Sequence, residues 1–248
     1  MKRLARMVQP MSFRRHDEHV SGMEAHSPNV TLVADPVVRV IRVRLEPAHP
    51  AADAILPPEE RTGSPAVRTA RAAARAVLAP LVGVEPGAVP IVRNCERCGH
   101  PTHGRPRVAG HDDVSFSVSH SADTALIAIS TAGVTVGVDL EARRSRARLP
   151  ELARRIMRPE QFEAWAPLAA DAQLDEFFRV WTTKEAYLKA IGLGIVTRLA
   201  DVPADPDGWH VAPITAPPGF VAALATDARV AVEYGEFDGF SANAGTAS

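Results

Sequence analysis

The order of predicted elements along the chain indicates an α+β protein with two similar halves. The order is strand, helix, strands, and then helices and strands again, with one long helix and about three strands in each half. With 248 residues, of which 46% are hydrophobic and 23% charged, the chain is long enough for a sizeable core. We place the hinge near Gly133 and expect the halves at residues 30–132 and 133–237, between a flexible N-terminal extension at 1–29 and a tail at 238–248.

The first half is predicted to begin with a strand and to continue into an arginine-rich helix. Residues 38–45 largely alternate apolar and basic side chains, which predicts an edge or half-exposed strand. Residues 66–79 have apolar positions at helical spacing, and we expect this helix to end before Pro80 because proline cannot donate a helical hydrogen bond. Strands at 114–119 and 124–130 complete this half.

The second half is predicted to combine one strand, three helices and a final set of short strands. The strand covers 135–141, and short helices follow at 149–157 and 159–167. The strongest helical pattern in the chain covers 171–191. The final strands are expected at 209–211, 220–226 and 230–234.

Composition excludes several classes of protein. A formal net charge of -1 gives no global electrostatic reason to expect nucleic acid or an anionic membrane as a partner. The longest apolar run, residues 125–138, is too short and too interrupted for a membrane helix, and residues 1–29 lack the apolar core of a secretory signal. Only two cysteines occur, so we expect a cytoplasmic protein without a disulfide framework.

A local excess of arginine stands out against this neutral background. It lies within residues 61–107, where acidic residues are sparse. The arginines there are Arg61, Arg68, Arg71, Arg75, Arg93, Arg97, Arg105 and Arg107. The excess suits a phosphorylated ligand, and a solvated arginine-rich face is an equal alternative on composition alone.

The strand at 135–141 carries two acids on one face. Side chains alternate along a strand, so Asp139 and Glu141 point to the same side and Val138 and Leu140 to the other. Two neighbouring carboxylates repel each other, and a hard cation such as Mg²⁺ with oxygen ligands would offset that repulsion. The alternative is a strand end that simply exposes both acids to water.

The helix at 171–191 interrupts its own apolar stripe with an acid. The stripe consists of Leu174, Phe178, Trp181 and Leu188. Glu185 takes the missing place in that series, and Lys189 follows one turn later, whereas Lys184 is expected to point aside. A buried carboxylate needs a partner, so a divalent-metal site for phosphate chemistry is one interpretation. A marginal i,i+4 ion pair is the other.

The two segments together resemble the bipartite signature of the 4′-phosphopantetheinyl transferases, in the surfactin-synthetase-activator type that forms the pseudo-dimeric branch. The matching stretches are residues 137–141 and 181–189. Residues 116–121 are similar to the Ser-His-Ser motif of that branch, and 103–106 to its Gly-Lys-Pro loop with Arg105 in place of lysine. The resemblance covers about residues 38–226. It implies two halves, each a small antiparallel sheet packed on a long helix, with a ligand cleft between them.

The resemblance also implies a reaction and roles for particular residues. Such enzymes transfer phosphopantetheine from coenzyme A to a serine of an acyl or peptidyl carrier protein, and they release adenosine 3′,5′-bisphosphate. In polyketide, nonribosomal peptide or fatty-acid biosynthesis this step activates the carrier. The implied metal ligands for Mg²⁺ are Asp139, Glu141 and Glu185. Glu185 and Lys189 would be catalytic, as base and as phosphate ligand. The implied coenzyme A contacts are Arg68, Arg71, Arg105, Ser119, His120 and Lys189.

The carrier is expected to be acidic and to dock beside residues 192–196 and the basic run 143–148. A monomer is expected, because one pseudo-dimeric chain supplies both halves. The rival hypothesis is a non-catalytic module that binds a carrier protein or nucleic acid through its arginines and a cysteine–histidine loop. That loop contains four potential zinc ligands, Cys95, Cys98, His100 and His103. Their spacing is tighter than in familiar zinc fingers, so we favour a loop without metal and keep zinc as an alternative.

Overall fold

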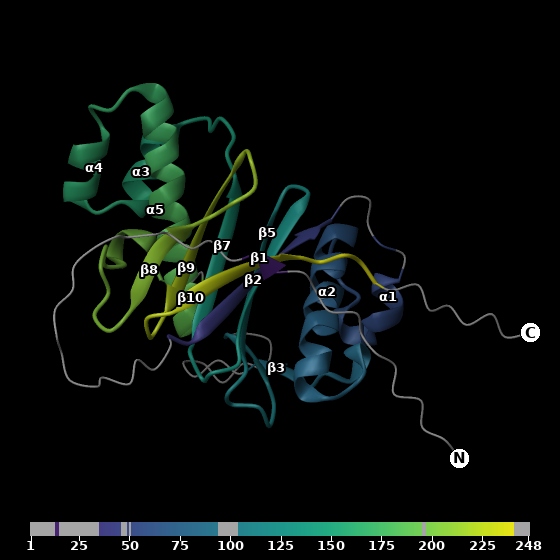
Figure 1. The fold of residues 1–248 in the computed structure, drawn as a ribbon. Helices are drawn as coiled ribbons and strands as arrows, with labels where there is room; N and C mark the ends of the chain where they lie inside the picture. Colours follow the sequence, from purple (N-terminus) through teal and green to yellow (C-terminus); the bar gives the residue numbers. More distant parts are fainter. Residues whose placement is uncertain are drawn as a thin grey trace, which may run out of the picture.

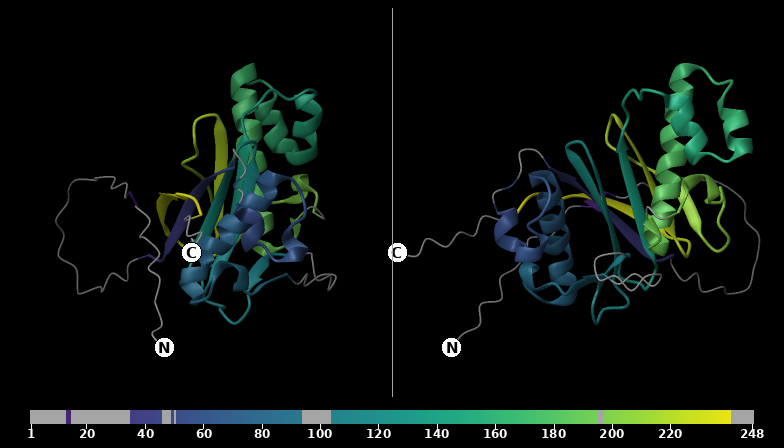
Figure 2. Two further views of the ribbon diagram at one scale, coloured as in Figure 1. Left: turned by 90° about the vertical axis from the view of Figure 1, so that its right-hand side faces the viewer. Right: turned by 180° about the vertical axis from the view of Figure 1, so that it is seen from behind.

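The computed structural model describes residues 13–14, 35–45, 49, 51–93, 104–194 and 197–240. It confirms the α+β class, with mixed sheets and helices. Figures 1 and 2 show the strands in the middle of the molecule, with α1 and α2 at one end and α3, α4 and α5 at the other.

The largest sheet has the strand order β1-β10-β2-β6-β5. Its strands are β1 Phe13–Arg14, β2 Val37–Arg44, β5 Ser115–Ser121, β6 Thr124–Ser130 and β10 Ala231–Glu236. The β2–β10 pair is parallel and the other pairs are antiparallel, so the expectation of a purely antiparallel sheet was wrong. Of the two expected placements of β2, an edge or a half-exposed strand, the edge is excluded because β10 and β6 flank it, and its exposed and buried residues agree with a half-exposed strand. Its two sides are nonetheless distinct, with Val38 and Val40 buried and Arg39 exposed.

Strand β10 comes from the far end of the chain and yet joins the sheet of the first half. Val232 and Tyr234 on β10 pack against the core that contains Val38 and Val40. Arg42 of β2 forms an ion pair with Glu236 of β10 at 2.8 Å. A cut of the sequence near Gly133 therefore does not separate the sheets, because the first sheet takes a strand from each side of it.

Helix α2 Pro65–Val82 covers this sheet and is accompanied by the short helix α1 Ala52–Ile55. The Ser64 hydroxyl caps it by accepting from the N–H of Val67 at 3.3 Å. The helix passes through Pro80 and ends at Gly83, whose φ of 70° is the left-handed conformation that glycine tolerates. The predicted end before Pro80 was therefore wrong: the helix continues to Val82 and tolerates the one hydrogen bond that Pro80 cannot donate. Short elements complete this part: η1 Pro58–Glu60, η2 Pro86–Ala88, β3 Ile91–Arg93 and β4 Pro106–Val108.

The second half is a three-stranded antiparallel sheet in the order β7-β9-β8. Its strands are β7 Val136–Ala142, β8 His210–Ile214 and β9 Phe220–Thr226. Its helices are α3 Leu149–Ile156, α4 Pro159–Trp165 and α5 Ala170–Ile191, followed by the 3₁₀ turn η4 Leu199–Asp201.

Helix α5 lies unusually close to β7, and Gly137 makes this possible. A Cβ atom at Gly137 would lie 2.1 Å from the carbonyl oxygen of Ala186 and 2.5 Å from the backbone nitrogen of Ala190. Ala223 and Ala225 of β9 extend the same small-residue contact. Because side chains alternate, the face of β7 that carries Gly137 also carries the acids, and it faces α5.

The two halves meet where β5 lies beside β7 (Figure 1). Four serine hydroxyls of β5 accept hydrogen bonds from four backbone N–H groups of β7 at 3.0–3.1 Å. The pairs are Ser115 with Val136, Ser117 with Val138, Ser119 with Leu140, and Ser121 with Ala142. The seam between the halves is thus a row of side-chain hydroxyls bound to backbone. Among the described residues, no helix has the length and apolar character needed to cross a membrane.

Candidate functional site

The acid pair lies at the seam, on the face of β7 that meets α5. Asp139 is buried, with 4% of its surface exposed, and Glu141 is half-buried. Lys189 reaches Asp139 from α5, and its Nζ lies 2.6 Å from Asp139 Oδ1. The Ser119 hydroxyl donates to the same oxygen at 2.8 Å. Three elements therefore meet at one carboxylate: β5, β7 and α5.

The second oxygen of Asp139 is in a different situation. Oδ2 is buried, and no hydrogen-bond partner for it exists within the described parts of the chain. A buried carboxylate oxygen without a partner is energetically costly. Its position next to other acids makes it a natural ligand for a cation.

Glu185 lies on α5 one turn before Lys189 and is half-buried. Burial raises the pKa of its carboxyl, the charge of Asp139 raises it further, Lys189 opposes this shift, and Glu141 adds a smaller rise. The expected core-facing position is only partly correct. The fully buried ionisable residue of this helix is instead Lys184, with 3% of its surface exposed, and it points aside from the Glu185 and Lys189 face, as expected.

Glu141 is held by two neighbours. The Ser121 hydroxyl donates to its Oε2 at 3.0 Å, and Arg146 lies 3.6 Å from the same oxygen. Burial and the charge of Asp139 raise the pKa of Glu141, while Ser121 and Arg146 lower it. Arg146 also lies over the ring of Phe178 at 5.3 Å. Sequence reasoning placed Arg146 only in a docking run, because no local pattern relates it to Glu141.

The three acids affect one another electrostatically, but they do not converge on one point. In the part of the chain that the structure describes, no group of three or more His, Cys, Asp and Glu side chains is close enough to hold a metal ion. The chemistry of the site still fits a hard cation, because Asp139 presents an unpartnered buried oxygen and negative charge raises the pKa of both glutamates. Asp139, Glu141 and Glu185 are the residues that would supply the oxygen ligands.

A basic region adjoins the acids. His120 lies on β5 with its ring only partly buried. This partial burial, followed by the charges of Lys189 and Arg71, lowers its pKa, whereas Asp139 raises it. The backbone of Arg105 lies beside the end of α5, where a Cβ at Gly192 would be 3.3 Å from its nitrogen. His120 and Arg105 thus approach the Lys189 end of α5 from the first half.

Arg68 and Arg71 make contacts that the sequence did not predict. Arg68 pairs with Asp53 at 2.7 Å and donates to the carbonyl of Gly63 at 2.9 Å. Arg71 donates to the carbonyls of Glu60 and Thr62, each at 2.9 Å. Both arginines therefore bind the loop before α2 in this structure, and Arg71 is also an electrostatic neighbour of His120 and Arg93.

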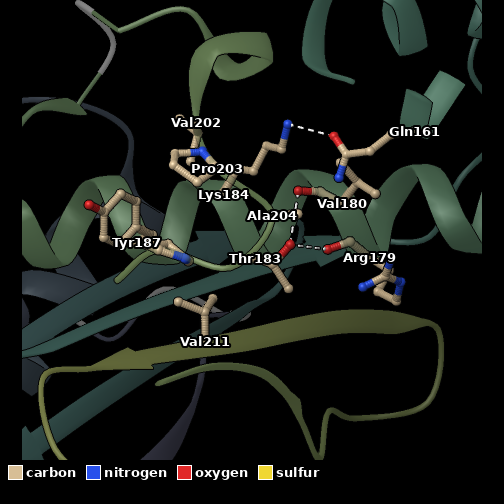
Figure 3. A pocket seen from close by; sticks show the side chains of 11 residues that line it. Gln161, Arg179, Val180, Thr183, Lys184, Tyr187, Val202, Pro203, Ala204 and Val211 are labelled. Carbon is tan, nitrogen blue, oxygen red and sulfur yellow. Dashed lines mark hydrogen bonds between the residues drawn. The ribbon is translucent and has the colours of Figure 1, made fainter. Parts of the chain in front are cut away.

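The opposite side of α5 carries a small pocket, shown in Figure 3. Thr183, Lys184 and Tyr187 line it, and helical periodicity places them away from Glu185 and Lys189. The Lys184 ammonium donates to three acceptors at its edge, which are the Ile156 carbonyl, the Gln161 side chain and the Leu199 carbonyl, at 2.7–3.0 Å. Burial lowers the pKa of Lys184 to about 8. With every donor satisfied, this lysine connects α5 to the end of α3 and to η4, and it takes no part in the acid site.

The expected docking surface is described only in part. Arg143 forms ion pairs with Asp175 and with Asp171, the latter at 3.5 Å, and so links the loop after β7 to α5. Residues 195–196 lie outside the described residues. The proposed zinc ligands also lie outside them: Cys95, Cys98, His100 and His103.

The family model that matches this chain covers its second half. Residues 135–245 match the family model described as the 4′-phosphopantetheinyl transferase superfamily. The 4′-phosphopantetheinyl transferase HetI of Nostoc sp. is 37% identical over 143 residues, which cover 56% of this chain and 58% of the relative. The 4′-phosphopantetheinyl transferase AcpT of Escherichia coli O157:H7 is 35% identical over 89 residues, 36% of this chain and 45% of the relative.

A mammalian relative also matches. The mouse L-aminoadipate-semialdehyde dehydrogenase-phosphopantetheinyl transferase is 29% identical over 103 residues, which cover 39% of this chain and 33% of that protein. The chain thus spans about half the length of the first of these relatives and a third of the mouse protein. The matched region contains β7 and α5, which carry the acids and Lys189. Residues 135–245 of the chain are therefore similar to the 4′-phosphopantetheinyl transferase superfamily.

Proposed function

We propose that this protein transfers the 4′-phosphopantetheine group from coenzyme A to a serine of an acyl or peptidyl carrier protein and releases adenosine 3′,5′-bisphosphate. One observation carries the proposal. Asp139 is buried between Lys189 and Ser119, and its second oxygen has no partner in the described structure. A fixed anion beside a lysine, with an open oxygen ligand, is suited to a cation that neutralises phosphate charge.

The proposed roles follow from where each side chain lies. Phosphoryl transfer depends on positioning and on charge neutralisation more than on covalent help. Lys189, half-buried at the seam, binds a phosphate oxygen of the donor and stabilises the leaving group. Glu185 accepts the proton of the carrier serine as its oxygen forms the new bond to phosphorus and the pyrophosphate linkage breaks. The raised pKa of Glu185 suits a base that must take up a proton.

Magnesium is the cation we propose, with Asp139, Glu141 and Glu185 as its protein ligands. When bound, Mg²⁺ would neutralise charge on the coenzyme A pyrophosphate and orient it. The remaining contacts to coenzyme A are proposed for His120 and Arg105, with Arg68 and Arg71 on the side of the adenosine phosphates. Arg68 and Arg71 would have to exchange their loop contacts for the ligand, so they carry the least structural support of this set.

The partner we propose is an acidic carrier protein. It would meet the basic loop after β7, where Arg144 and Arg148 are exposed, near the end of α5. The proposal includes a monomeric, cytoplasmic enzyme of the pseudo-dimeric branch. Its basis is that one chain provides both sides of the seam on which the acids lie.

The variants that test this proposal change the acids one at a time. Asp139→Ala and Glu185→Gln are expected to lower transfer to a purified apo carrier by at least about 10²-fold, because charge-stabilising groups commonly contribute that much. Glu163→Gln, an exposed acid on α4, is the matched control and should keep normal activity. Intact-mass measurement of the carrier with time provides the rates. Near-normal turnover in either site variant would refute the assigned roles.

A further inference from the structure

The hydroxyl row between β5 and β7 contains two kinds of serine. All four hydroxyls accept a backbone N–H from β7, at 3.0–3.1 Å. Ser119 and Ser121 also donate a hydrogen bond to a carboxylate. In each case the carboxylate belongs to the residue that precedes the backbone partner on β7, which is Asp139 for Ser119 and Glu141 for Ser121. For Ser115 and Ser117, the corresponding residues are Thr135, just before β7, and Gly137, and neither has a carboxylate.

The contacts of Ser119 fix the direction of its proton. Its oxygen accepts the Leu140 N–H at 3.1 Å and the Lys189 ammonium at 2.8 Å. A hydroxyl has one proton and two acceptor lone pairs, so both lone pairs are used. The proton is then directed to Asp139 Oδ1, 2.8 Å away. Oδ1 receives Ser119 and Lys189 together, which leaves Oδ2 turned from these donors, buried and without a partner among the described residues.

Ser121 repeats the arrangement two residues later. Its oxygen accepts the Ala142 N–H at 3.0 Å and its proton goes to Glu141 Oε2, also at 3.0 Å. Arg146 approaches the same carboxylate oxygen at 3.6 Å. Both acids of β7 are thus held through β5, a strand of the opposite half.

We propose that Ser119 and Ser121 are positioning residues: their hydroxyls, oriented by the backbone of β7, hold Asp139 and Glu141 in the orientation that leaves oxygen ligands open for a divalent cation. This inference rests on the proposed function for the identity of that cation. It gives Ser119 a different role from the coenzyme A contact that the family resemblance implies, because the three hydrogen bonds use every donor and acceptor of its hydroxyl.

The seam supplies its own control. Ser117 is as buried as Ser119, with 4% and 5% of their surfaces exposed, and each accepts one β7 N–H at 3.1 Å. Replacing either by alanine removes the same bond between the halves. Only Ser119 touches an acid. A loss of metal affinity in both alanine variants would therefore come from the weakened contact between the halves. A loss in the Ser119 variant alone would come from the changed position of Asp139.

The test is a titration of the 248-residue chain with Mn²⁺, in which the electron paramagnetic resonance signal measures the free ion. Ser119→Ala and Ser121→Ala are each expected to weaken Mn²⁺ binding about tenfold, the lower end of what loss of a hydrogen bond to a metal ligand costs. Ser117→Ala should bind within about twofold of the wild type, since it contacts no ligand. Ser121→Thr retains the hydroxyl at this half-buried position and should bind Mn²⁺ as tightly as the wild type.

Thermal unfolding without metal checks that the alanine variants fold. Ser121→Ala keeps the inference testable if Ser119→Ala does not fold. Equal Mn²⁺ affinity in the wild type and both acid-linked variants would overturn the positioning role. So would an equal loss in Ser117→Ala, or a wild type that binds no Mn²⁺. A wild type that binds Mn²⁺ with the expected pattern but modifies no carrier would overturn the transfer activity and leave the positioning role standing.

Discussion

At the scale of single residues, the site depends on a balance of charge around Asp139. Three acids and one lysine lie together at the partly buried seam between the halves. Lys189 donates to one oxygen of Asp139 and leaves the other oxygen without a partner among the described residues. Burial and like charge raise the pKa of Glu141 and Glu185, so each pays a cost when it ionises in the folded protein. A bound cation would remove this cost, because its positive charge stabilises the ionised carboxylates.

The first prediction concerns Glu185→Gln in the absence of divalent cations. The folded-state pKa of Glu185 is raised, so the folded protein binds more protons than the unfolded chain, and stability falls as pH rises above the ordinary carboxyl pKa. The amide cannot ionise, so the variant should be more stable than the wild type at neutral pH. Its advantage should shrink toward pH of about 4, where the glutamate is protonated in both states. Urea unfolding at several pH values, with chelator present, measures this.

Glu163→Gln provides the control for that series. Its side chain is exposed on α4, and the substitution should change stability little and without pH dependence. A Glu185→Gln variant that is less stable than the wild type at neutral pH would show that Lys189 outweighs the repulsion.

At the scale of the elements, the contact between β7 and α5 sets the position of Lys189 relative to Asp139. Gly137 does not have a positive φ, so it is needed there for space and not for backbone conformation. The absence of a side chain allows the helix to lie against the strand. The same face of β7 carries Asp139 two residues later.

The second prediction is that Gly137→Ala destabilises the protein strongly. The new methyl group would overlap backbone atoms of Ala186 and Ala190, which cannot move as a side chain can. We expect a loss of about 3 kcal/mol or more in the free energy of unfolding, at the upper end of overpacking effects. Gly83→Ala is the control: the position has open space and a φ of 70°, so it should cost only about 1–2 kcal/mol of backbone strain. Chemical denaturation distinguishes the two, and equal losses would contradict the packing argument.

Local patterns in the sequence predicted much of this level of structure. Strands β6 and β9 have the predicted bounds, and the alternation that puts Asp139 and Glu141 on one face is a local property. The burial of Lys184 was not predicted, because the acceptors that stabilise it belong to α3, α4 and η4, which lie 15–28 residues away. The partners of Arg68 were likewise hidden, because a sequence shows which side chains carry charge and not which distant carbonyls they meet.

At the scale of the whole molecule, the chain joins its ends in one sheet. Strand β10 lies beside β2, and Phe237 and Phe240 then pack against the core under α2. A pairing across almost two hundred residues has no local signature, so the sequence predicted β10 as a strand and assigned it to the wrong sheet. The site lies at the seam between this sheet and that of the second half, and strands of both sheets contribute side chains to it.

The third prediction is that deleting residues 231–248 prevents stable folding, although most of the first half remains. The deletion removes a strand and exposes the edge of β2, which invites aggregation. Deleting only residues 238–248 keeps β10 and should cost chiefly the packing of Phe240. Size-exclusion chromatography and thermal unfolding of both truncations compare these outcomes. A soluble, cooperatively folded chain ending at residue 230 would contradict the role given to β10.

The central claim is the transfer of phosphopantetheine, and one reaction tests it most directly. The wild-type protein is incubated with coenzyme A, Mg²⁺ and several apo carrier proteins, and both the carrier mass and the nucleotide product are measured. The claim predicts that at least one carrier gains one phosphopantetheine group per reactive serine, with an equal amount of adenosine 3′,5′-bisphosphate released, and that chelation of Mg²⁺ stops both. Carriers that bind the protein but keep their apo mass would contradict it.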